Sequence, residues 1–181
     1  TYCDIMALYS NLGFSKGRAT MTDRLFLEIL KTAINGEDFS YSGILSREET
    51  EEILKTAELH RVFPLVFDKV YGNCPYDERE KENLKKRAKL MILQQSLREE
   101  GFLKLYTELL RKGLKPVVVK GIVCRYLYPN PEFRASSDED LLVDAEDMEL
   151  YDKILNELGL RKQENGKENP YEFSYFSDDG L

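Results

Sequence analysis

The sequence of 181 residues has few cysteines, a single histidine and no long apolar run, and each shortage excludes a class of protein. Its three cysteines, Cys3, Cys74 and Cys124, are odd in number, far apart and without a C-x-x-C pair. This spacing provides neither a disulfide framework nor a zinc site and is typical of reduced thiols. The histidine, His60, follows an apolar helical pattern, so a packing or hydrogen-bonding role is favoured over catalysis.

No window reaches the about 18 apolar residues that a membrane span requires, and residues 1–20 lack the apolar centre of a signal peptide. We therefore expect a cytoplasmic protein without a membrane partner. The formal net charge of −7 argues against general binding of nucleic acid. A basic run at Lys85–Arg87 follows three glutamates, so it is interpreted as a charged helix face.

Residues 1–113 show the apolar spacing of helices. We expect helices over 22–34, from the capping box that begins at Ser46, over 65–71, and over 77–112, where Gly113 ends the last of them. Residues 1–20 carry little pattern, and Met21 precedes the first well-formed helix. The segment 1–20 is therefore interpreted either as native chain or as an extension before a natural start at Met21.

Residues 114–181 lack the long helical spacing of the first half, and their pattern predicts a small α/β region. A β-branched strand is predicted at Val117–Val119, followed by a short helix from Ile122 to Tyr128 and a second buried strand at Leu141–Val143. Asp144 is predicted to cap a helix with Met148 to Leu158 on its buried face. Short strands are expected at 160–163 and 171–176, with a hairpin turn at 177–180. Together the two halves predict an α+β fold hinged near Gly113.

The residues with the clearest chemistry lie between the first two predicted strands. Asp138 and Asp140 are two residues apart, so a strand would place both carboxylates on one face with α-carbons about 6.5 Å apart. Two carboxylates on one face are suited to a divalent metal ion. Lys120 and Gly121 stand at a strand-to-helix turn, where an ammonium and a bare backbone favour phosphate. Metal ligands beside a phosphate-binding turn suggest phosphoryl or nucleotidyl transfer.

Each of these residues also has a plain structural interpretation. An acidic pair at a strand edge is often a solvated turn, and lysine is common at strand ends. Arg134 either forms a salt bridge with the acidic cluster or clamps a triphosphate. Ser136 and Ser137 either turn the chain or donate hydroxyls to a phosphate. Cys124, within an apolar run, is interpreted as a small buried side chain.

The segment from Lys120 to Val143 resembles the signature of the uncharacterised nucleotidyltransferase family of the DNA polymerase β-like superfamily. The matching pattern is K-G-x-x-x-x-x-L-Y-P-x-P-x-x-R-x-S-x-D-x-D-L-L-V, and weaker likeness extends over about 21–181, including 57–70. The resemblance implies a helical half packed on a small mixed-sheet nucleotidyltransferase-like domain. It implies Asp138 and Asp140 as catalytic ligands of Mg²⁺ or Mn²⁺, with Lys120, Gly121, Arg134, Ser136 and Ser137 at the nucleotide.

The sequence departs from the wider superfamily pattern in three places. Ile122 stands where glycine or serine is usual, Glu139 where an apolar residue is usual, and the third carboxylate has no clear candidate. Glu172 lies on a predicted strand, but the resemblance implies a third acid just beyond Leu181. Either the chain belongs to a longer protein or its site is catalytically incomplete. The last strand would then lack its sequence-adjacent partner, which predicts self-association through its edge or cover from the helices.

Three function classes stay open at this point. The first is a nucleotidyltransferase that moves a nucleoside monophosphate from an NTP, ATP being the one expected, to an unidentified hydroxyl acceptor. The second is a domain of the same fold that binds nucleotide or a partner protein without turnover. The third is a helical interaction protein whose acidic pair is incidental.

Overall fold

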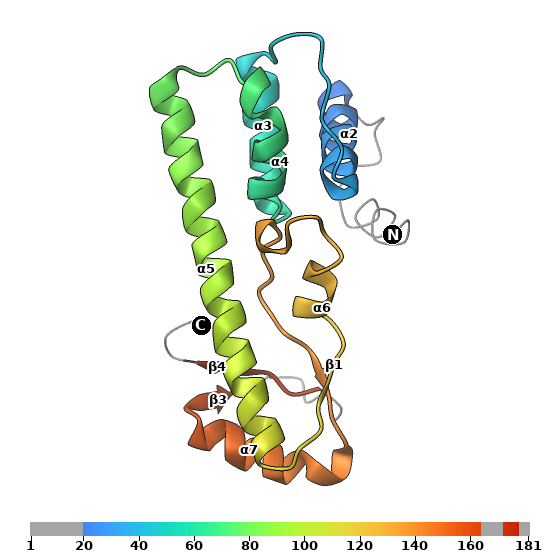
Figure 1. The fold of residues 1–181 in the computed structure, drawn as a ribbon, viewed down its shortest axis with the longest axis vertical. Coiled ribbons are helices and arrows are strands. Elements are labelled where there is room, and N and C mark those ends of the chain that lie inside the picture. The colour runs from blue at the N-terminus through green and yellow to red at the C-terminus, as the bar shows by residue number, and fades with distance from the viewer. Residues whose placement is uncertain (1–19, 164–171, 178–181) are drawn as a thin grey trace.

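The computed structural model describes residues 20–163 and 172–177 (Figure 1). The molecule is elongated, with helices of the N-terminal half at one end and short strands at the other (Figure 1). The first elements are α2 (Met21–Asn35), α3 (Arg47–Leu59), α4 (Phe63–Val70) and η1 (Tyr71–Asn73). Among the described residues, no helix is both long enough and apolar enough to cross a bilayer.

Helices α2, α3 and α4 share the first apolar core. Their starts follow local rules: Thr20 pairs with Asp23, and Ser46 with Glu49, in reciprocal capping boxes. Gly36, with φ 72°, ends α2 in the left-handed conformation. The predicted helices and the capping box at Ser46 are thereby confirmed. The centre of this core is Phe26, Ile29, Leu30, Ala33, Leu45, Ile53, Ala57, Phe63, Leu65, Val66 and Val70, all buried.

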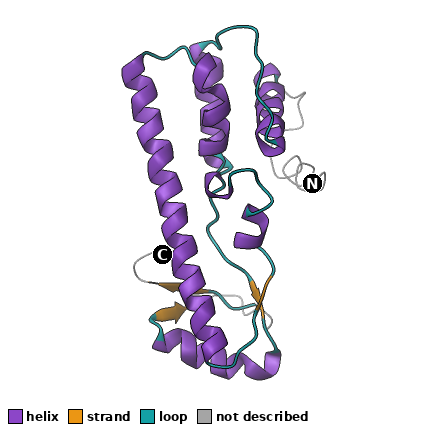
Figure 2. Cartoon of the chain, in the orientation of Figure 1, coloured by secondary structure: helices purple, strands orange, loops and turns teal. Residues whose placement is uncertain are grey.

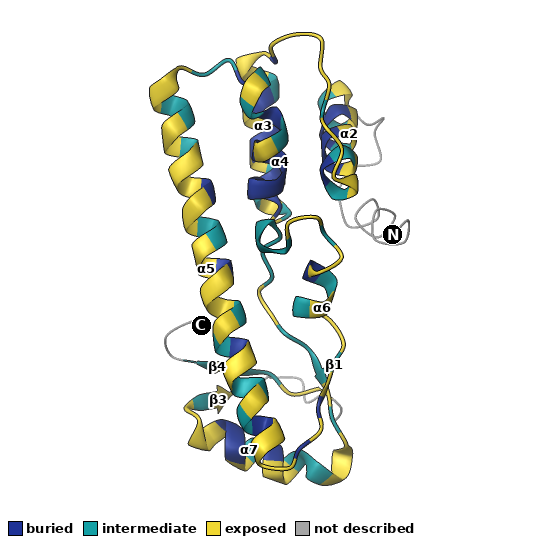
Figure 3. Ribbon diagram, in the orientation of Figure 1, coloured by how far each residue is buried: buried dark blue, intermediate teal, exposed yellow. Residues whose placement is uncertain are grey.

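Helix α5 (Glu78–Arg111) joins the two ends of the molecule (Figures 1 and 2). The side chain of Asp77 accepts a hydrogen bond from the Glu80 amide and caps the helix, close to the predicted start. Its 34 residues span about 51 Å at 1.5 Å per residue. Ala88 contributes to the first core, whereas Leu109 contributes to the second. Most of the α5 surface is exposed, with buried positions spaced along the helix (Figure 3). One helix therefore supports both halves of the chain.

The remaining elements are short (Figure 2). They are β1 (Val117–Val118), α6 (Ile122–Arg125), η2 (Pro131–Phe133), β2 (Leu141–Leu142), η3 (Ala145–Asp147), α7 (Met148–Glu157), β3 (Leu160–Lys162) and β4 (Tyr175–Ser177). The second core consists of Leu109, Leu114, Tyr151, Ile154 and Leu155. Gly113, with φ 87°, turns the chain after α5 at the predicted hinge. Tyr128 and Phe133 nevertheless pack against the first core, so the C-terminal half contacts both cores.

The α+β class is confirmed, but the strands form two separate pairs instead of one mixed sheet. β1 lies antiparallel to β2, with Val117 opposite Leu142, and β3 lies antiparallel to β4. A parallel pair would need a crossover of a dozen or more residues, usually a helix. The link between β1 and β2 instead holds the one-turn α6, the 3-10 turn η2 and loops, and it brings β2 back beside β1 in the antiparallel direction. The chain therefore turns back on itself.

Three local predictions were wrong in detail. The helix expected to reach Tyr128 ends at Arg125, because the Leu127 and Tyr128 amides donate three residues back instead of four. Pro129 then disfavours helical backbone at Tyr128. The strand expected to be buried has an exposed face: Leu142 is 63% exposed. Cys124 is half-buried instead of buried.

The C-terminal predictions also changed. Asp144 makes no side-chain cap; η3 follows it, and α7 begins only at Met148. The strand predicted over 171–176 is β4, which begins at Tyr175 and pairs with β3, so one of its edges is occupied. Self-association through the other edge stays a prediction. Most of the predicted turn at 177–180 and the segment 1–19 lie outside the described residues.

Candidate functional site

The predicted site residues come together where β1 and β2 meet α6. The register of the two strands continues past β1, because the Val119 amide donates to the Asp140 carbonyl at 3.0 Å. This places Lys120 beside Asp140, with 3.6 Å between Nζ and Oδ2. The Lys120 side chain is 72% exposed, so its ammonium contacts solvent in addition to the Asp140 carboxylate.

Contacts alternate along residues 138–143 as they do in a strand. Glu139 contacts Arg125, and Leu141 and Val143 pack against the second core. Asp138 and Leu142 are exposed. Because successive side chains point to opposite sides of an extended chain, Asp138 and Asp140 share the side away from Glu139. This alternation agrees with a shared side for Asp138 and Asp140, and that both carboxylates face one metal ion stays a prediction.

Glu139 makes the closest polar contacts of the site. Its carboxylate accepts hydrogen bonds from the Ile122 amide at 2.5 Å and from Arg125 Nη1 at 2.6 Å. The Arg125 side chain is fully buried, and its Nη2 lies 3.6 Å from Glu99 Oε2 on α5. The Tyr126 hydroxyl donates to the same Glu99, and this hydrogen bond raises the pKa of Tyr126. One arginine therefore links α5, α6 and the acidic segment.

Gly121 makes the approach of Glu139 possible. Its φ of 65° is a conformation that glycine adopts readily and other residues rarely adopt. A Cβ atom at this position would overlap the Glu139 carboxylate and lie 2.9 Å from the Asp138 carbonyl oxygen. The bare backbone predicted at the strand-to-helix turn is present, but Glu139 occupies it and takes the Ile122 amide. A phosphate would reach that amide only by displacing Glu139.

The two serines order the chain around Asp138. The Ser137 hydroxyl donates to Asp138 Oδ1 at 2.8 Å, and the Ser136 hydroxyl donates to the Asp138 carbonyl at 3.0 Å. The Ser136 backbone is fixed to α5, because its amide donates to Gln95 Oε1 and its carbonyl accepts from Arg98. The loop before the aspartates is therefore supported from the long helix.

Arg134 does not form the salt bridge with the acidic cluster that was one of its two expected roles. Its guanidinium lies over the Tyr128 ring, 5.6 Å from the centroid, and it forms no ion pair with any residue that the structure describes. Its charge is thus held beside the loop that carries the serines.

A third metal ligand is not found near the aspartates. Across residues 20–163 and 172–177, no group of three or more His, Cys, Asp or Glu side chains has a geometry that could hold a metal ion. Glu172, considered from the sequence, precedes β4 and is not part of such a group. The described chain offers the two aspartates alone.

Sequence reasoning missed Gln95, Glu99 and Arg125 as members of the site. Gln95 interrupts the apolar stripe of α5, yet it is only 2% exposed. Arg125 is the one charge within the apolar run from Ile122 to Tyr128. A polar residue in an otherwise apolar pattern was the available signal, because such a residue is buried only when a partner is present.

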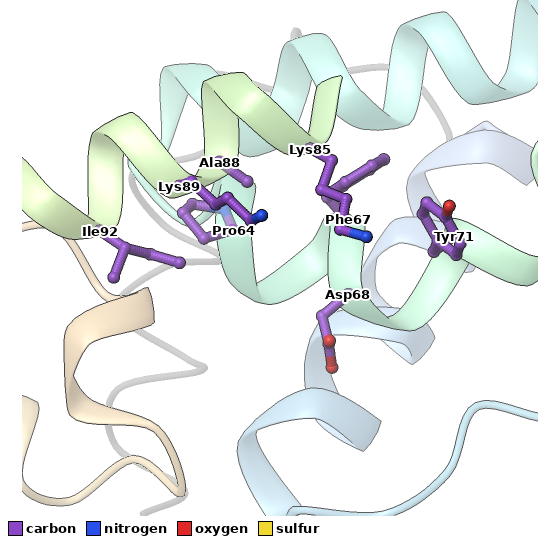
Figure 4. A pocket seen from close by; sticks show the side chains of 8 residues that line it. All are labelled: Pro64, Phe67, Asp68, Tyr71, Lys85, Ala88, Lys89 and Ile92. Atoms are coloured by element: carbon purple, nitrogen blue, oxygen red, sulfur yellow. The ribbon is translucent and has the colours of Figure 1, made fainter. Parts of the chain in front are cut away.

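The helical half carries a groove of its own (Figure 4). It is formed by α4, η1 and α5 and has a volume of about 290 Å³. Its lining residues are Pro64, Phe67, Asp68, Tyr71, Lys85, Ala88, Lys89 and Ile92. Nearby, Arg87 pairs with Glu58 and lies over the Phe63 ring, which supports interpreting this basic run as a helix face. The groove contains none of the predicted site residues.

A family model described as uncharacterised nucleotidyltransferase matches residues 46–180, most of the chain and all of the site. Searches of curated proteins and of solved structures returned no significant match. The chain therefore belongs to the uncharacterised nucleotidyltransferase family.

Proposed function

We propose that this protein is a metal-dependent nucleotidyltransferase that moves a nucleoside monophosphate from an NTP, ATP being the expected one, to a hydroxyl acceptor. The observation that carries the proposal is the inward contacts of Glu139, Leu141 and Val143, from which we infer that Asp138 and Asp140 share the other side of this segment. The family model matches the same segment. The charge of Lys120 beside them supports it. The match supports nucleotidyl transfer; the metal, the nucleotide and the acceptor are our inference.

The donor set fits Mg²⁺ or Mn²⁺. Both aspartates offer carboxylate oxygens on the solvent side, and one or two carboxylates plus substrate phosphates are a common way to bind Mg²⁺. The hydroxyl of Ser137 holds one oxygen of Asp138, which leaves the other for a metal ion. A bound ion would neutralise the charge that develops on the transferred phosphoryl group.

The side chains of Lys120 and Arg134 are the proposed phosphate ligands. Lys120 is largely exposed and can pair with a phosphate oxygen while it remains near Asp140. Arg134 would leave the Tyr128 ring or use its outer N–H groups. Ser136 and Ser137 orient the acidic segment, and Gly121 permits the close turn. The Ile122 amide has no part in this assignment, because it donates to Glu139.

A second candidate is a domain that binds nucleotide or a partner protein without turnover. The described residues supply two carboxylates, and a third normally positions the acceptor's metal ion in two-metal chemistry. This candidate keeps the metal and the nucleotide but predicts no transfer. For either candidate we propose the cytoplasm as the compartment, since Cys74 and Cys124 are free thiols.

Calorimetry with ATP, with Mg²⁺ and then with EDTA, tests the metal site. We expect binding with Mg²⁺ alone, because the acidic face would repel an uncomplexed triphosphate. Asp138→Asn and Asp140→Asn should each remove the effect of Mg²⁺, whereas Asp38→Asn, at an exposed position on the helical half, should not. Equal ATP binding in EDTA would exclude the metal from the proposal. Transfer of label from the α-phosphate of ATP to an acceptor mixture then separates the enzyme from the silent domain.

A further inference from the structure

Glu139 stands between the two aspartates and points to the opposite side of the chain. Its carboxylate is bound by the Ile122 amide and by Arg125, and its side chain is only 17% exposed. The turn at Gly121 accommodates it, since any Cβ there would overlap this carboxylate. Three independent features thus hold one side chain inward: an amide, a guanidinium and a missing Cβ.

Arg125 makes the inward position of Glu139 hard to change. The guanidinium has no exposed surface, and its second acidic neighbour, Glu99, lies farther away at 3.6 Å. Its Nε and Nη2 atoms have no hydrogen-bond acceptor within the described chain, so Glu139 provides the one close hydrogen bond to this side chain. Removing one partner of a buried ion pair leaves an uncompensated buried charge, which is strongly unfavourable. Glu139 therefore cannot turn outward without a large cost at Arg125.

We propose that Glu139, through Arg125, is the positioning residue that holds Asp138 and Asp140 outward toward the metal ion. With alternate side chains on opposite faces, fixing residue 139 inward fixes residues 138 and 140 outward. Glu139 touches neither metal nor nucleotide in this scheme. The part that concerns metal affinity rests on the proposed function, whereas the orientation of the segment does not.

The substitution Arg125→Met separates a positioning role from a purely electrostatic one, because the two predict opposite changes in Mn²⁺ affinity. Arg125→Met removes a positive charge near the aspartates, so a purely electrostatic site would bind Mn²⁺ more tightly. If Glu139 instead positions the aspartates, loss of Arg125 frees its carboxylate from the inward position. The aspartates then lose their fixed orientation, and the affinity for Mn²⁺ falls. Loss of a residue that orients metal ligands typically lowers affinity by about 10- to 100-fold.

The double variant Arg125→Met/Glu139→Leu keeps the net charge and replaces the pair by apolar side chains. Such replacements of buried ion pairs are often neutral or stabilising. A buried leucine anchors residue 139 as the glutamate does. We therefore expect the Mn²⁺ affinity to stay within about threefold of that of the unmodified chain, a smaller change than the about 10- to 100-fold loss expected for Arg125→Met. Glu146→Gln, at an exposed position, is the control for a lost carboxylate.

Two readouts are measured on the full chain: Mn²⁺ affinity by titration calorimetry, and amide exchange at Ile122 and Val119 by NMR. The Ile122 amide donates to the Glu139 carboxylate, and the Val119 amide donates to the Asp140 carbonyl. We expect weaker Mn²⁺ binding and faster exchange of both amides in Arg125→Met. In the double variant, Mn²⁺ affinity and the protection of Val119 should be restored, whereas Ile122 should still exchange fast because leucine offers it no acceptor. Should Arg125→Met not fold, the double variant alone decides.

Unchanged or tighter Mn²⁺ binding in a folded Arg125→Met would overturn the proposal. So would a folded double variant that loses Mn²⁺ affinity, because Glu139 would then be needed for its own charge. If the unmodified chain binds no Mn²⁺, the proposed function fails, and the exchange data alone judge the orientation. Unaltered protection of the Val119 amide in Arg125→Met would then refute it.

Discussion

Gly121 and Glu139 fit together as a bare backbone and the carboxylate that fills the space beside it. Gly121 has φ 65°, and a Cβ would collide with the Glu139 side chain and with the backbone of Asp138. The Glu139 side chain could move aside, but the Asp138 carbonyl oxygen, 2.9 Å from the added Cβ, belongs to the backbone and could not. The position therefore requires glycine for two reasons, conformation and space.

We predict that Gly121→Ala lowers the free energy of unfolding by about 3 kcal/mol, from strain at positive φ and the displaced acidic segment. Urea unfolding followed by circular dichroism measures it. The matched control is Gly101→Ala in the middle of α5, where an added Cβ meets nothing within 4 Å. That change should stabilise the protein by about 0.5–1 kcal/mol, as alanine does in a helix. Similar effects of both substitutions would contradict the close approach at Gly121.

Gln95→Leu should cost about 1–3 kcal/mol of stability, since the Ser136 amide loses its acceptor. The Gln95 side chain is buried, and its Oε1 lies 2.8 Å from the Ser136 nitrogen. Gln94→Leu, one residue away on the exposed side of α5, is the control and should change stability by less than about 0.5 kcal/mol. Thermal unfolding of both variants measures this difference. If Gln95→Leu left the stability unchanged, the hydrogen bond from the Ser136 amide to Gln95 would not stabilise the fold.

The helices could be predicted because their signals are local. The capping box at Ser46, the cap at Asp77 and Gly36 each determine an end from residues within one turn. The pairing of strands was less accessible. Residues 117–118 and 141–142 have strand-forming side chains, but whether they pair parallel or antiparallel depends on the path of the loop between them.

At the site, residue types were easier to predict than partners. The shared side of Asp138 and Asp140 follows from a spacing of two. A bare backbone at Gly121 was predicted too, but for an external phosphate, whereas the anion beside it is Glu139. Which acid Arg125 meets is decided by tertiary packing across 14 residues of chain, and no local pattern contains that choice.

Asp138→Asn and Asp140→Asn should leave folding stability within about 1 kcal/mol of the unmodified chain, because exposed ion pairs contribute little. Asp140 pairs with a Lys120 side chain that is 72% exposed, and Asp138 accepts from Ser137, which an asparagine oxygen can replace. Differential scanning calorimetry without metal measures this. A loss of several kcal/mol in both variants would show that the acids are structural, and the metal site would lose its main support.

The last prediction concerns the response of stability to alkaline pH through Cys74. Its thiol is buried and donates to the Val70 carbonyl at 3.2 Å, and burial raises the pKa of Cys74 from 9.0 to about 11. A raised pKa in the folded state means that the unfolded chain releases this proton first. The stability is fully present below pH 9 and is lost as the pH rises toward 11.

The expected slope from this group is about 1.4 kcal/mol per pH unit between these values. Burial also raises the pKa of Tyr175, to about 12, so it contributes above pH 10. Urea unfolding of the unmodified chain and of Cys74→Ala at half-unit steps from pH 8 to 11 isolates the cysteine, because the tyrosine is common to both. The two curves of unfolding free energy should converge as the pH rises, since only the unmodified chain loses the contribution of the thiol. Parallel curves over the whole range would mean that the Cys74 thiol titrates as freely in the folded protein as in the unfolded chain.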